Sequence, residues 1–309
     1  MKTRPHTVAT LLSTYNGEAF LAAQLDSLAA QDGVRLEVFA RDDGSSDRTL
    51  DILADYARLW PQLASPLGGG NLGPARSFLA LLGAVPATFD HYAFCDQDDV
   101  WLPDKLARAV ATLADADPDR PALYCSKALC VDEALRPMGE SLFMGTGRFE
   151  ELLFANMAIG NTVVMNAAAF QLIRSRPPAG GVIMHDWWCA LVISAFGVIL
   201  FDERPGVLYR QHPGNVFGSR PSRLSSILAQ APALLRDPSR FYPIHGQAAE
   251  LLRLFGDQLP ADLRMMTQAL VSSRRSLIAR LRFALFGRMP RTTVLGAISG
   301  RLLVAAGFY

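Results

Sequence analysis

Three carboxylates stand within four residues, at Asp96, Asp98 and Asp99, directly after the apolar run 92–95. Burying carboxylates side by side is unfavourable unless positive charge lies among them. A divalent cation that prefers oxygen ligands supplies such charge, and one with open coordination positions also binds a diphosphate. Because Asp is also common at turns and helix N-caps, an acidic turn between a strand and a helix is the alternative.

The residues before this cluster alternate between strand and helix patterns. Apolar runs at 8–12 and 36–40 predict buried strands, and each is followed by a polar loop, at 13–17 and 41–47, and then by a helical period. This alternation is typical of a parallel sheet, in which ligands bind beyond the carboxyl ends of the strands. We therefore expect the two polar loops and the acidic cluster to lie at one edge of the sheet.

A glycine-rich loop at 68–73 precedes a predicted helix at 75–82 that carries Arg76 near its start. A helix N-terminus beside an arginine predicts an anion site. The spacing matches neither a P-loop nor the dinucleotide-binding fingerprint, so a plain linker is the alternative.

The rest of the chain changes character near residue 221. Before that point the patterns predict further strands and helices, including strands at 122–126, 160–165, 198–202 and 206–212. After it they are helical, at 224–235, 248–255 and 263–281. We therefore expect an α/β catalytic domain over residues 1–220 and a helical extension over 221–309.

The charge of the chain is unevenly distributed. The 309 residues are half apolar and carry a formal net charge of +1. No acid follows Asp262, although arginine occurs there at 264, 274, 275, 280, 282, 288, 291 and 301. A basic segment with Leu277, Leu281 and Leu285 on one side suits the anionic face of a bilayer. A helix packed on the catalytic domain is the alternative, and nucleic-acid binding is not expected because aromatic residues do not alternate with the charges.

The cysteines and the N-terminus predict a location inside the cell. The four cysteines form no CxxC pair, which favours small buried hydrophobes in a reducing compartment. The N-terminal residues lead directly into a strand without an apolar signal region, and no window of 18 uncharged apolar residues predicts a spanning helix. We expect a cytoplasmic protein that is peripheral on the inner face of the cytoplasmic membrane.

Five motifs together resemble a known family. They are Ser-Thr-Tyr-Asn-Gly-Glu at 13–18, Arg-Asp-Asp-Gly-Ser-Ser-Asp at 41–47, Asn-Leu-Gly at 71–73, Asp-Gln-Asp-Asp-Val-Trp at 96–101 and His-Asp-Trp-Trp at 185–188. Their order and spacing over residues 6–220 are similar to family 2 glycosyltransferases, and most of all to bacterial rhamnosyltransferases that build surface polysaccharides. The resemblance implies the GT-A nucleotide-sugar-binding fold, a Rossmann-like, mainly parallel mixed sheet flanked by helices. It places a nucleotide-binding half at about 6–100 and an acceptor half at about 101–220.

The resemblance assigns the donor nucleotide to the first loops. Ser13, Tyr15, Asp42 and Asp43 would hold the nucleobase and ribose, with the Tyr15 ring against the base. Arg76 is similar in position to an arginine that contacts the base or the diphosphate.

The resemblance assigns the metal to the acidic cluster. Asp98 would bind Mg²⁺ or Mn²⁺, Asp96 would bind the ribose or the metal, and Asp99 would face the donor sugar. The cation would stabilise the charge that develops on the leaving diphosphate. His212 resembles a histidine that approaches the metal or the diphosphate, although a lone histidine is often purely structural.

The resemblance places the general base at Asp186, where it would take the proton from the acceptor hydroxyl. An N-cap is the alternative role for this residue. Trp187 and Trp188 would stack on an acceptor sugar, and packing in the core is the alternative for both.

The function implied is inverting, metal-dependent transfer of a sugar from a nucleoside diphosphate donor to a glycan or lipid-linked glycan. The leading donor is dTDP-rhamnose, and a UDP donor of glucose, galactose or N-acetylhexosamine is the first alternative. A nucleotidyltransferase is disfavoured because residues 13–17 lack its Gly-rich, basic loop. A non-catalytic glycan-binding protein is disfavoured by the carboxylates at 96, 98 and 186. The oligomeric state cannot be read from the sequence.

Overall fold

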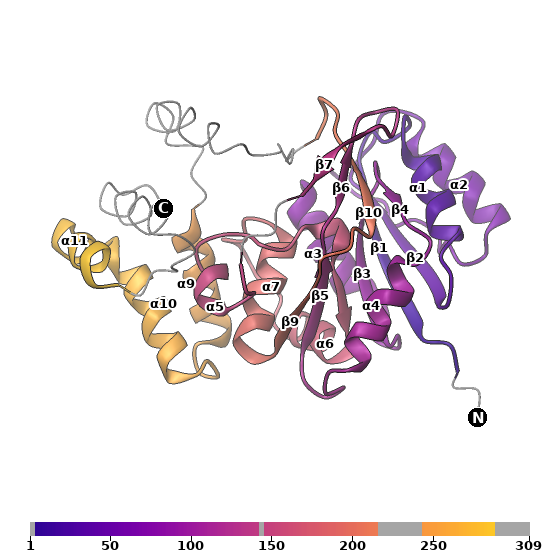
Figure 1. Ribbon diagram of the computed structural model, residues 1–309. Helices are drawn as coiled ribbons and strands as arrows, with labels where there is room; N and C mark the ends of the chain where they lie inside the picture. Colours follow the sequence, from indigo (N-terminus) through magenta and orange to yellow (C-terminus); the bar gives the residue numbers. More distant parts are fainter. Residues whose placement is uncertain (1–3, 142–144, 216–242, 288–309) are drawn as a thin grey trace. The chain divides into compact units, whose positions relative to one another are not determined.

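A computed structural model describes residues 4–141, 145–215 and 243–287 of the chain (Figure 1). The chain divides into two compact units. Of the described residues, the first contains 4–141, 158–177 and 197–215, and the second contains 145–157, 178–196 and 243–287. The expected boundary near 220 lies outside the described residues and stays a prediction. The segments 143–157 and 178–196, which we expected in the catalytic domain, instead group with the C-terminal helices.

The first unit is built on a six-stranded mixed sheet in the order β2-β1-β3-β8-β5-β9. β1 runs parallel to β2 and β3, β5 runs parallel to β9, and the short β8 is antiparallel to both β3 and β5. The strands are β1 (Thr7–Thr14), β2 (Arg35–Asp42), β3 (His91–Asp96), β5 (Ala122–Ser126), β8 (Val164–Asn166) and β9 (Val198–Asp202). The mixed, mainly parallel sheet predicted from the sequence is confirmed.

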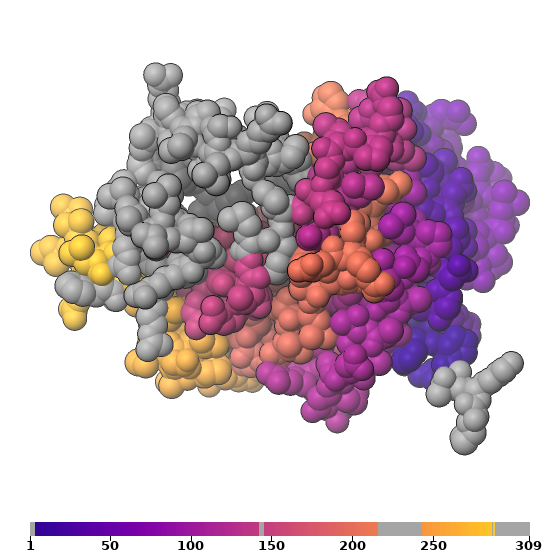
Figure 2. Space-filling view, in the orientation of Figure 1, coloured from indigo at the N-terminus to yellow at the C-terminus, as the bar shows by residue number. Residues whose placement is uncertain are grey.

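A second sheet in the same unit has four short strands in the order β4-β10-β6-β7. Their bounds are β4 (Val100–Trp101), β6 (Leu129–Val131), β7 (Pro137–Glu140) and β10 (Val207–Arg210). The sequence predicted only β10, because strands of two to four residues contain too few alternations to reveal a period. β7 is exposed along its whole length, and its Pro and Gly disfavour a strand. Residues in the magenta range of the colour bar, which includes β7, are visible on the surface in Figure 2.

Five α-helices of the described residues accompany these sheets. They are α1 (Leu21–Ala29), α2 (Thr49–Leu59), α3 (Pro74–Ala84), α4 (Lys105–Ala114) and α6 (Ala167–Ser175). α3 begins with a proline, whose fixed φ suits the first helical position. The Asn166 side chain caps α6 by accepting a hydrogen bond from Ala169 N at 2.9 Å. The predicted strand over 160–165 is shorter than expected, because Gly160–Thr162 forms a 3-10 turn before β8.

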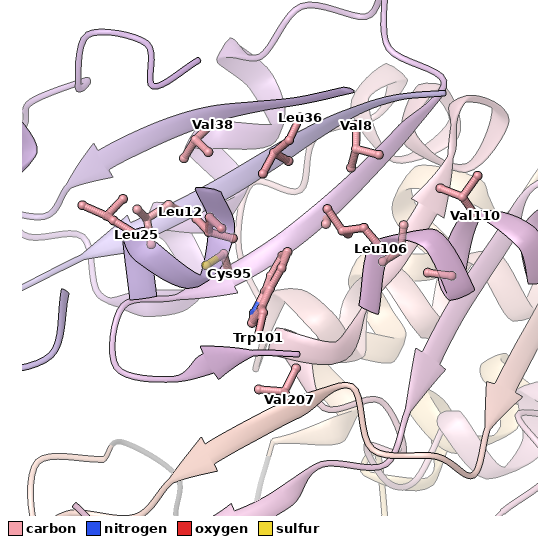
Figure 3. Packing of buried hydrophobic residues seen from close by; sticks show 14 of the residues in the cluster. Val8, Leu12, Leu25, Leu36, Val38, Cys95, Trp101, Leu106, Val110 and Val207 are labelled. Carbon is pink, nitrogen blue, oxygen red and sulfur yellow. The ribbon is translucent and has the colours of Figure 1, made fainter. Parts of the chain in front are cut away.

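The buried core of the first unit includes the end of the acidic motif (Figure 3). Trp101 is buried close to Leu106 and Val207, and the strand register places Val207 directly opposite Trp101. The backbone N–H of Trp101 donates to Ser27 Oγ at 3.0 Å. The loop that carries the three carboxylates is therefore anchored in the core at both ends, by β3 before it and by Trp101 after it.

The second unit is helical in its described residues. Its helices are α5 (Phe149–Leu152), α7 (His185–Phe196), α9 (Ile244–Phe255), α10 (Ala261–Ser273) and α11 (Leu277–Phe286). The single helix predicted over 263–281 is two helices, and Ser276 caps the second by accepting from Ala279 N at 3.1 Å. The predicted helix over 224–235 and the apolar stretch 294–309 lie outside the described residues.

Two expectations about the chain as a whole can be compared with these residues. Cys95, Cys125, Cys130 and Cys189 are thiols outside any disulfide, and all four are buried, as predicted. In the portion of the chain that the structure describes, no helix has the length and apolar character needed to cross a membrane.

Candidate active site

The loops expected to form one site do meet at the carboxyl edge of the large sheet. The register pairs Thr14, the last residue of β1, with Asp42, the last residue of β2. It also pairs Ser13 with Asp96 at the end of β3. The residues predicted from three separate motifs are therefore neighbours across two strand pairs.

The loops after β1 and β2 are joined by hydrogen bonds from backbone to side chain. Asn16 N donates to Ser45 Oγ at 2.9 Å, and Gly17 N donates to Thr49 Oγ1 at 2.7 Å. Asn16 has a positive φ of 48°, a conformation that Asn adopts more readily than most residues. These bonds hold both loops in one arrangement.

Asp42 shapes the turn after β2. Its carboxylate accepts from Thr14 Oγ1 at 3.0 Å and from Ser45 N and Ser45 Oγ at 2.8 and 2.6 Å. The side chain is buried. The structure thus gives Asp42 a role in organising the loop, and its contact with a donor nucleotide stays a prediction.

Asp43 fixes the glycine-rich loop through a buried ion pair with Arg41. The Asp43 carboxylate accepts from Leu72 N and Gly73 N, both at 2.8 Å, while Arg41 Nη2 donates to Gly70 O at 3.0 Å. A Cβ at Gly69 would lie 2.8 Å from Arg41 Nη2, so this approach favours glycine. The predicted contact of Asp43 with the donor also stays a prediction. Arg41, which the sequence analysis did not single out, compensates the charge of the Asp43 carboxylate.

Gln97 joins the first loop to the acidic loop. Its side-chain amide accepts from Tyr15 N at 2.7 Å and donates to Tyr15 O at 2.9 Å. A Cβ at Gly17 would lie 2.3 Å from Gln97 Oε1, so this clamp requires glycine there. The sequence analysis missed Gln97, because the middle residue of an Asp-X-Asp motif has no predictable role from its type alone.

Three of the predicted donor-binding residues lie around this clamp. The Tyr15 side chain is 48% exposed beyond the end of β1. Ser13 Oγ lies 2.6 Å from Ser77 Oγ in the first turns of α3. Arg76, in that same first turn, is exposed and makes no hydrogen bond or ion pair within the described residues. Tyr15 and Arg76 are therefore available to a ligand in this arrangement.

Asp98 and His212 form a pair at the edge of the site. His212 Nε2 lies 2.9 Å from Asp98 Oδ2, and the two side chains are 14% and 16% exposed. Gly214 N donates to His212 Nδ1 at 3.2 Å. Because Nδ1 accepts a hydrogen bond, the neutral ring carries its proton on Nε2 and donates it to Asp98. The structure brings together the two residues predicted from distant motifs.

Asp99 lies below this pair and is completely buried. Its carboxylate accepts from the Asn161 side chain and, at 3.1 Å, from Arg210 N. Burial raises the pKa of Asp99 well above its usual range, and the charges of Asp98 and Asp96 raise it further. A contact between Asp99 and the donor sugar would require the Asp99 carboxylate to become exposed. That contact stays a prediction.

Two buried cations lie near the acidic loop. Arg210 Nε donates to Asp98 O at 2.9 Å, and its guanidinium lies over the Phe20 ring at 4.6 Å. Lys105 Nζ lies 3.1 Å from the centre of the Trp101 ring. Burial lowers the pKa of Lys105 to about 7, whereas Cys95 and Asp99 act in the opposite direction. Arg210 therefore supplies part of the positive charge that adjacent carboxylates require, whereas burial weakens this contribution from Lys105.

The chemistry of the Asp98–His212 pair fits a divalent cation. In the described residues, no group of three or more His, Cys, Asp or Glu side chains lies close enough to hold a metal alone. Asp98 and His212 offer a carboxylate oxygen and an imidazole nitrogen 2.9 Å apart, two groups of the kind that would hold such a cation. Mg²⁺ is commonly held by one or two protein groups together with substrate phosphates and water. The predicted role of Asp96, which is partly buried, stays a prediction.

The second unit holds the His-Asp-Trp-Trp motif at the start of α7. Asp186 is the second residue of this helix, and its Oδ2 accepts from Asn156 Nδ2 at 3.1 Å. Trp187 and Trp188 are both buried, and Trp187 Nε1 donates to Leu152 O at 2.5 Å. This burial agrees with core packing, the alternative given above for both rings, and their stacking on an acceptor sugar stays a prediction.

Comparison with known proteins agrees with this arrangement. Residues 10–127 match the family described as "Glycosyl transferase family 2". Over these residues the chain belongs to family 2 of the glycosyltransferases. It is 27% identical over 220 residues to a dTDP-rhamnosyl transferase RfbG of Shigella flexneri, a match that covers 67% of this chain and 74% of the relative. It is also 34% identical over 99 residues to the succinoglycan biosynthesis protein ExoW of Rhizobium meliloti, over 32% of this chain and 31% of that protein.

Solved structures confirm the GT-A fold of this glycosyltransferase. Residues 1–349 of S. aureus TarS in complex with UDP-GlcNAc superpose with a TM-score of 0.60 and 18% identity, over 97% of this chain and 81% of that one. The mannosyltransferase PcManGT of Pyrobaculum calidifontis, in complex with GDP-Man and Mn²⁺, superposes with a TM-score of 0.51 and 18% identity, over 99% and 83% of the chains. Both neighbours were solved in complex with a nucleotide-sugar donor.

The buried Arg41–Asp43 pair predicts a large effect of a small change. Asp43→Asn removes the charge that compensates buried Arg41, so we expect the free energy of unfolding to fall by roughly 3–5 kcal/mol. Urea denaturation followed by circular dichroism measures this quantity. The matched control is Asp55→Asn, which breaks the exposed pair with Arg58 and should change stability little. Equal effects of the two substitutions would contradict the role given to Asp43.

Proposed function

We propose that this glycosyltransferase is an inverting, metal-dependent enzyme that transfers rhamnose from dTDP-rhamnose to a hydroxyl of a glycan or lipid-linked glycan. The observation that carries the proposal is the Asp98–His212 pair, which lies beyond the carboxyl end of β3 and fits two positions of a divalent cation. The choice of rhamnose is supported by the motifs at 96–101 and 185–188 and by the dTDP-rhamnosyl transferase among the relatives.

Different residues of the first unit would contact different parts of the donor. Tyr15 offers an exposed ring to the pyrimidine, and Gln97 holds the backbone of that residue in register with the acidic loop. Arg76, exposed in the first turn of α3, combines its charge with a helix N-terminus, an arrangement that suits a diphosphate. Ser13, Asp42 and Asp43 keep the loops around the base and ribose in place.

Asp98 and His212 would hold Mg²⁺ or Mn²⁺, with Asp96 nearby. The cation supplies positive charge to the diphosphate as it leaves. Binding through His212 Nε2 requires that nitrogen to give up the proton that it now donates to Asp98. Arg210 keeps the Asp98 backbone in place through its 2.9 Å hydrogen bond to the carbonyl.

Asp186 is proposed as the general base, on the strength of its place in the motif order. Its carboxylate takes the proton from the acceptor hydroxyl while the oxygen forms a bond to the anomeric carbon. The bond from that carbon to the diphosphate breaks on the opposite side, which inverts the configuration. Asn156 orients the carboxylate by donating to Oδ2.

Two alternatives remain open to experiment. The solved neighbours carry UDP-GlcNAc and GDP-Man, so a UDP donor of glucose, galactose or N-acetylhexosamine is the first alternative to dTDP-rhamnose. A glycan-binding protein without catalysis is the second. Slow hydrolysis of any nucleotide sugar by the purified protein would exclude it.

We also propose that α11 contacts the anionic inner face of the cytoplasmic membrane. Leu277, Ile278 and Leu285 are 61%, 80% and 67% exposed on this helix, whereas Phe283 and Ala284 are buried. Arg280 and Arg282 lie on the same helix, and a helix with an exposed apolar side and arginines lies in a bilayer interface. This placement would bring the enzyme to a lipid-linked acceptor.

Asp98→Ala should weaken binding of Mn²⁺ in the presence of dTDP at least tenfold, because it removes one of two proposed protein ligands. The loss of the Mn²⁺ electron paramagnetic resonance signal on binding measures this affinity. Asp104→Ala, which removes a nearby exposed carboxylate, is the control and should leave the affinity unchanged. Unchanged Mn²⁺ binding in Asp98→Ala would end the metal role of this residue.

Asp186→Asn should lower kcat for transfer by about 10²–10⁴-fold, because the amide cannot accept the hydroxyl proton. The affinity for the donor nucleotide should stay the same. Initial rates of nucleoside diphosphate release, with dTDP-rhamnose as donor, test the first part, and nucleotide titration tests the second. Near-normal turnover would mean that the base lies elsewhere in the chain.

The double variant Leu277→Ser, Ile278→Ser should bind vesicles of phosphatidylglycerol more weakly than the unchanged protein. Both side chains are mostly exposed, so the substitutions remove apolar area without opening the core. Co-sedimentation measures the bound fraction. Leu59→Ser, at an 86% exposed leucine of α2, is the control, and equal binding by all three proteins would refute the membrane contact.

A further inference from the structure

The loop before α7 is held by a helix of the C-terminal extension. Residues 178–184 lead into the helix that carries Asp186, and their backbone N–H groups donate hydrogen bonds to side chains of α9. Ala179 N donates to Glu250 Oε1 at 2.6 Å, and Ile183 N donates to Gln247 Oε1 at 3.1 Å. The weaker bond from Gly180 N to Glu250 Oε1 measures 3.4 Å. Two side chains of α9 therefore fix the backbone within a few residues of the proposed base.

The backbones of this loop and of α9 also approach each other closely. Gly181 has a φ of 74°, and a Cβ there would lie 2.7 Å from Gly246 O in the first turn of α9. Only a glycine accepts both the positive φ and this approach without strain. Gly181 is thus the point at which this loop packs against α9.

The two anchoring side chains are themselves fixed. Arg253 donates to both carboxylate oxygens of Glu250 at 2.7 Å, and Gln247 is buried. These hydrogen bonds hold the pKa of Glu250 below its usual range, with the Arg253 side chain as the largest cause. Glu250 therefore stays ionised at neutral pH and remains an acceptor for the loop.

α9 is also packed against the body of α7. The Phe255 ring lies 6.5 Å from the Trp188 ring and 5.7 Å from the Phe196 ring, centre to centre. Asp186 itself accepts the 3.1 Å hydrogen bond from Asn156 Nδ2. Contacts within one unit therefore hold both the helix that carries Asp186 and its carboxylate.

We propose that Glu250 and Gln247 are positioning residues for the general base. Through them, α9 contributes to catalysis in addition to linking the enzyme to the proposed membrane-binding helix α11. The inference rests on the proposed role of Asp186. A base must lie within hydrogen-bond reach of the hydroxyl that it deprotonates, and a shift of about 1 Å costs up to 10²-fold in rate. Loss of either anchor should shift Asp186 and leave the donor site of the first unit unchanged.

The test compares Gln247→Met and Glu250→Met with two matched variants. Gln258→Met makes the same change at an exposed glutamine just after α9, and Glu250→Gln keeps an oxygen that accepts from Ala179 N. Three quantities are measured for each full-length protein. The first is kcat and KM for hydrolysis of the donor, with water as acceptor; the donor is dTDP-rhamnose, UDP-glucose or UDP-N-acetylglucosamine, whichever the unchanged enzyme hydrolyses fastest. The second is the Kd for the matching nucleotide in the presence of Mn²⁺. The third is the rate of hydrogen exchange of the backbone amides at 179–186.

We expect Gln247→Met and Glu250→Met to lower kcat at least tenfold, to leave KM and Kd within twofold, and to speed exchange at 179–183. Gln258→Met should change nothing, and Glu250→Gln should retain most of the rate. An unchanged kcat despite faster exchange would overturn the proposal, and so would a joint loss of kcat and nucleotide affinity. Asp186→Asn is measured in parallel, and normal hydrolysis by that variant would refute the base assignment and this inference together, while metal-dependent nucleotide binding would still support the donor site.

Discussion

The active site of this glycosyltransferase depends on how the charge of closely spaced carboxylates is compensated. Five aspartates lie at the carboxyl ends of β2 and β3 or just beyond them. The carboxylates of Asp42 and Asp43 are bonded by backbone N–H groups and, at Asp43, by Arg41. Asp99 is buried with donors from Asn161 and Arg210 N. A buried carboxylate costs several kcal/mol when it is left without such partners, so these three acids stabilise the loops that present the others.

This division leaves Asp98 with a different environment. It is partly exposed, and its described side-chain partner is a histidine, which is also a common metal ligand. The same motif therefore contains one acid that organises the fold and one that is available to a ligand, side by side in the chain. Gln97, directly before Asp98, ties the motif to the Tyr15 loop through two hydrogen bonds.

The sequence predicted the large sheet well, because its strands are long enough to show apolar runs and each ends in a distinctive polar loop. It also predicted the convergence of Ser13, Asp42, Asp96 and Asp98, which follows from parallel strand order alone. It did not predict β4, β6 and β7, whose few residues show no period. Gln97, Asn161 and Arg210 were missed because their roles arise from contacts between segments distant in sequence. Arg41 was missed because its burial, which makes the pair with nearby Asp43 important, is a property of the folded chain. The burial of Trp187 and Trp188 was undecidable from the motif, since an aromatic pair suits a core and a sugar equally well.

The largest difference concerns the C-terminal half. Composition indicated an appended basic segment, whereas the structure groups α5 and α7 with the helices after residue 243 into one unit. Helical periodicity cannot reveal this, because the contacts join Ala179 to Glu250 and Ile183 to Gln247 across about 70 residues of chain. The extension thus supports the segment that carries Asp186 through α9, while α11 exposes leucine and isoleucine side chains that suit a membrane surface.

The central claim is that the Asp98–His212 pair and the loops around it bind a nucleoside diphosphate together with a divalent cation. The most direct measurement is calorimetric titration of dTDP, UDP and GDP into the unchanged protein, with and without Mn²⁺. The account predicts binding that depends on Mn²⁺ and favours dTDP. Equal affinity with and without Mn²⁺, or no binding of any of the three nucleotides, would contradict it.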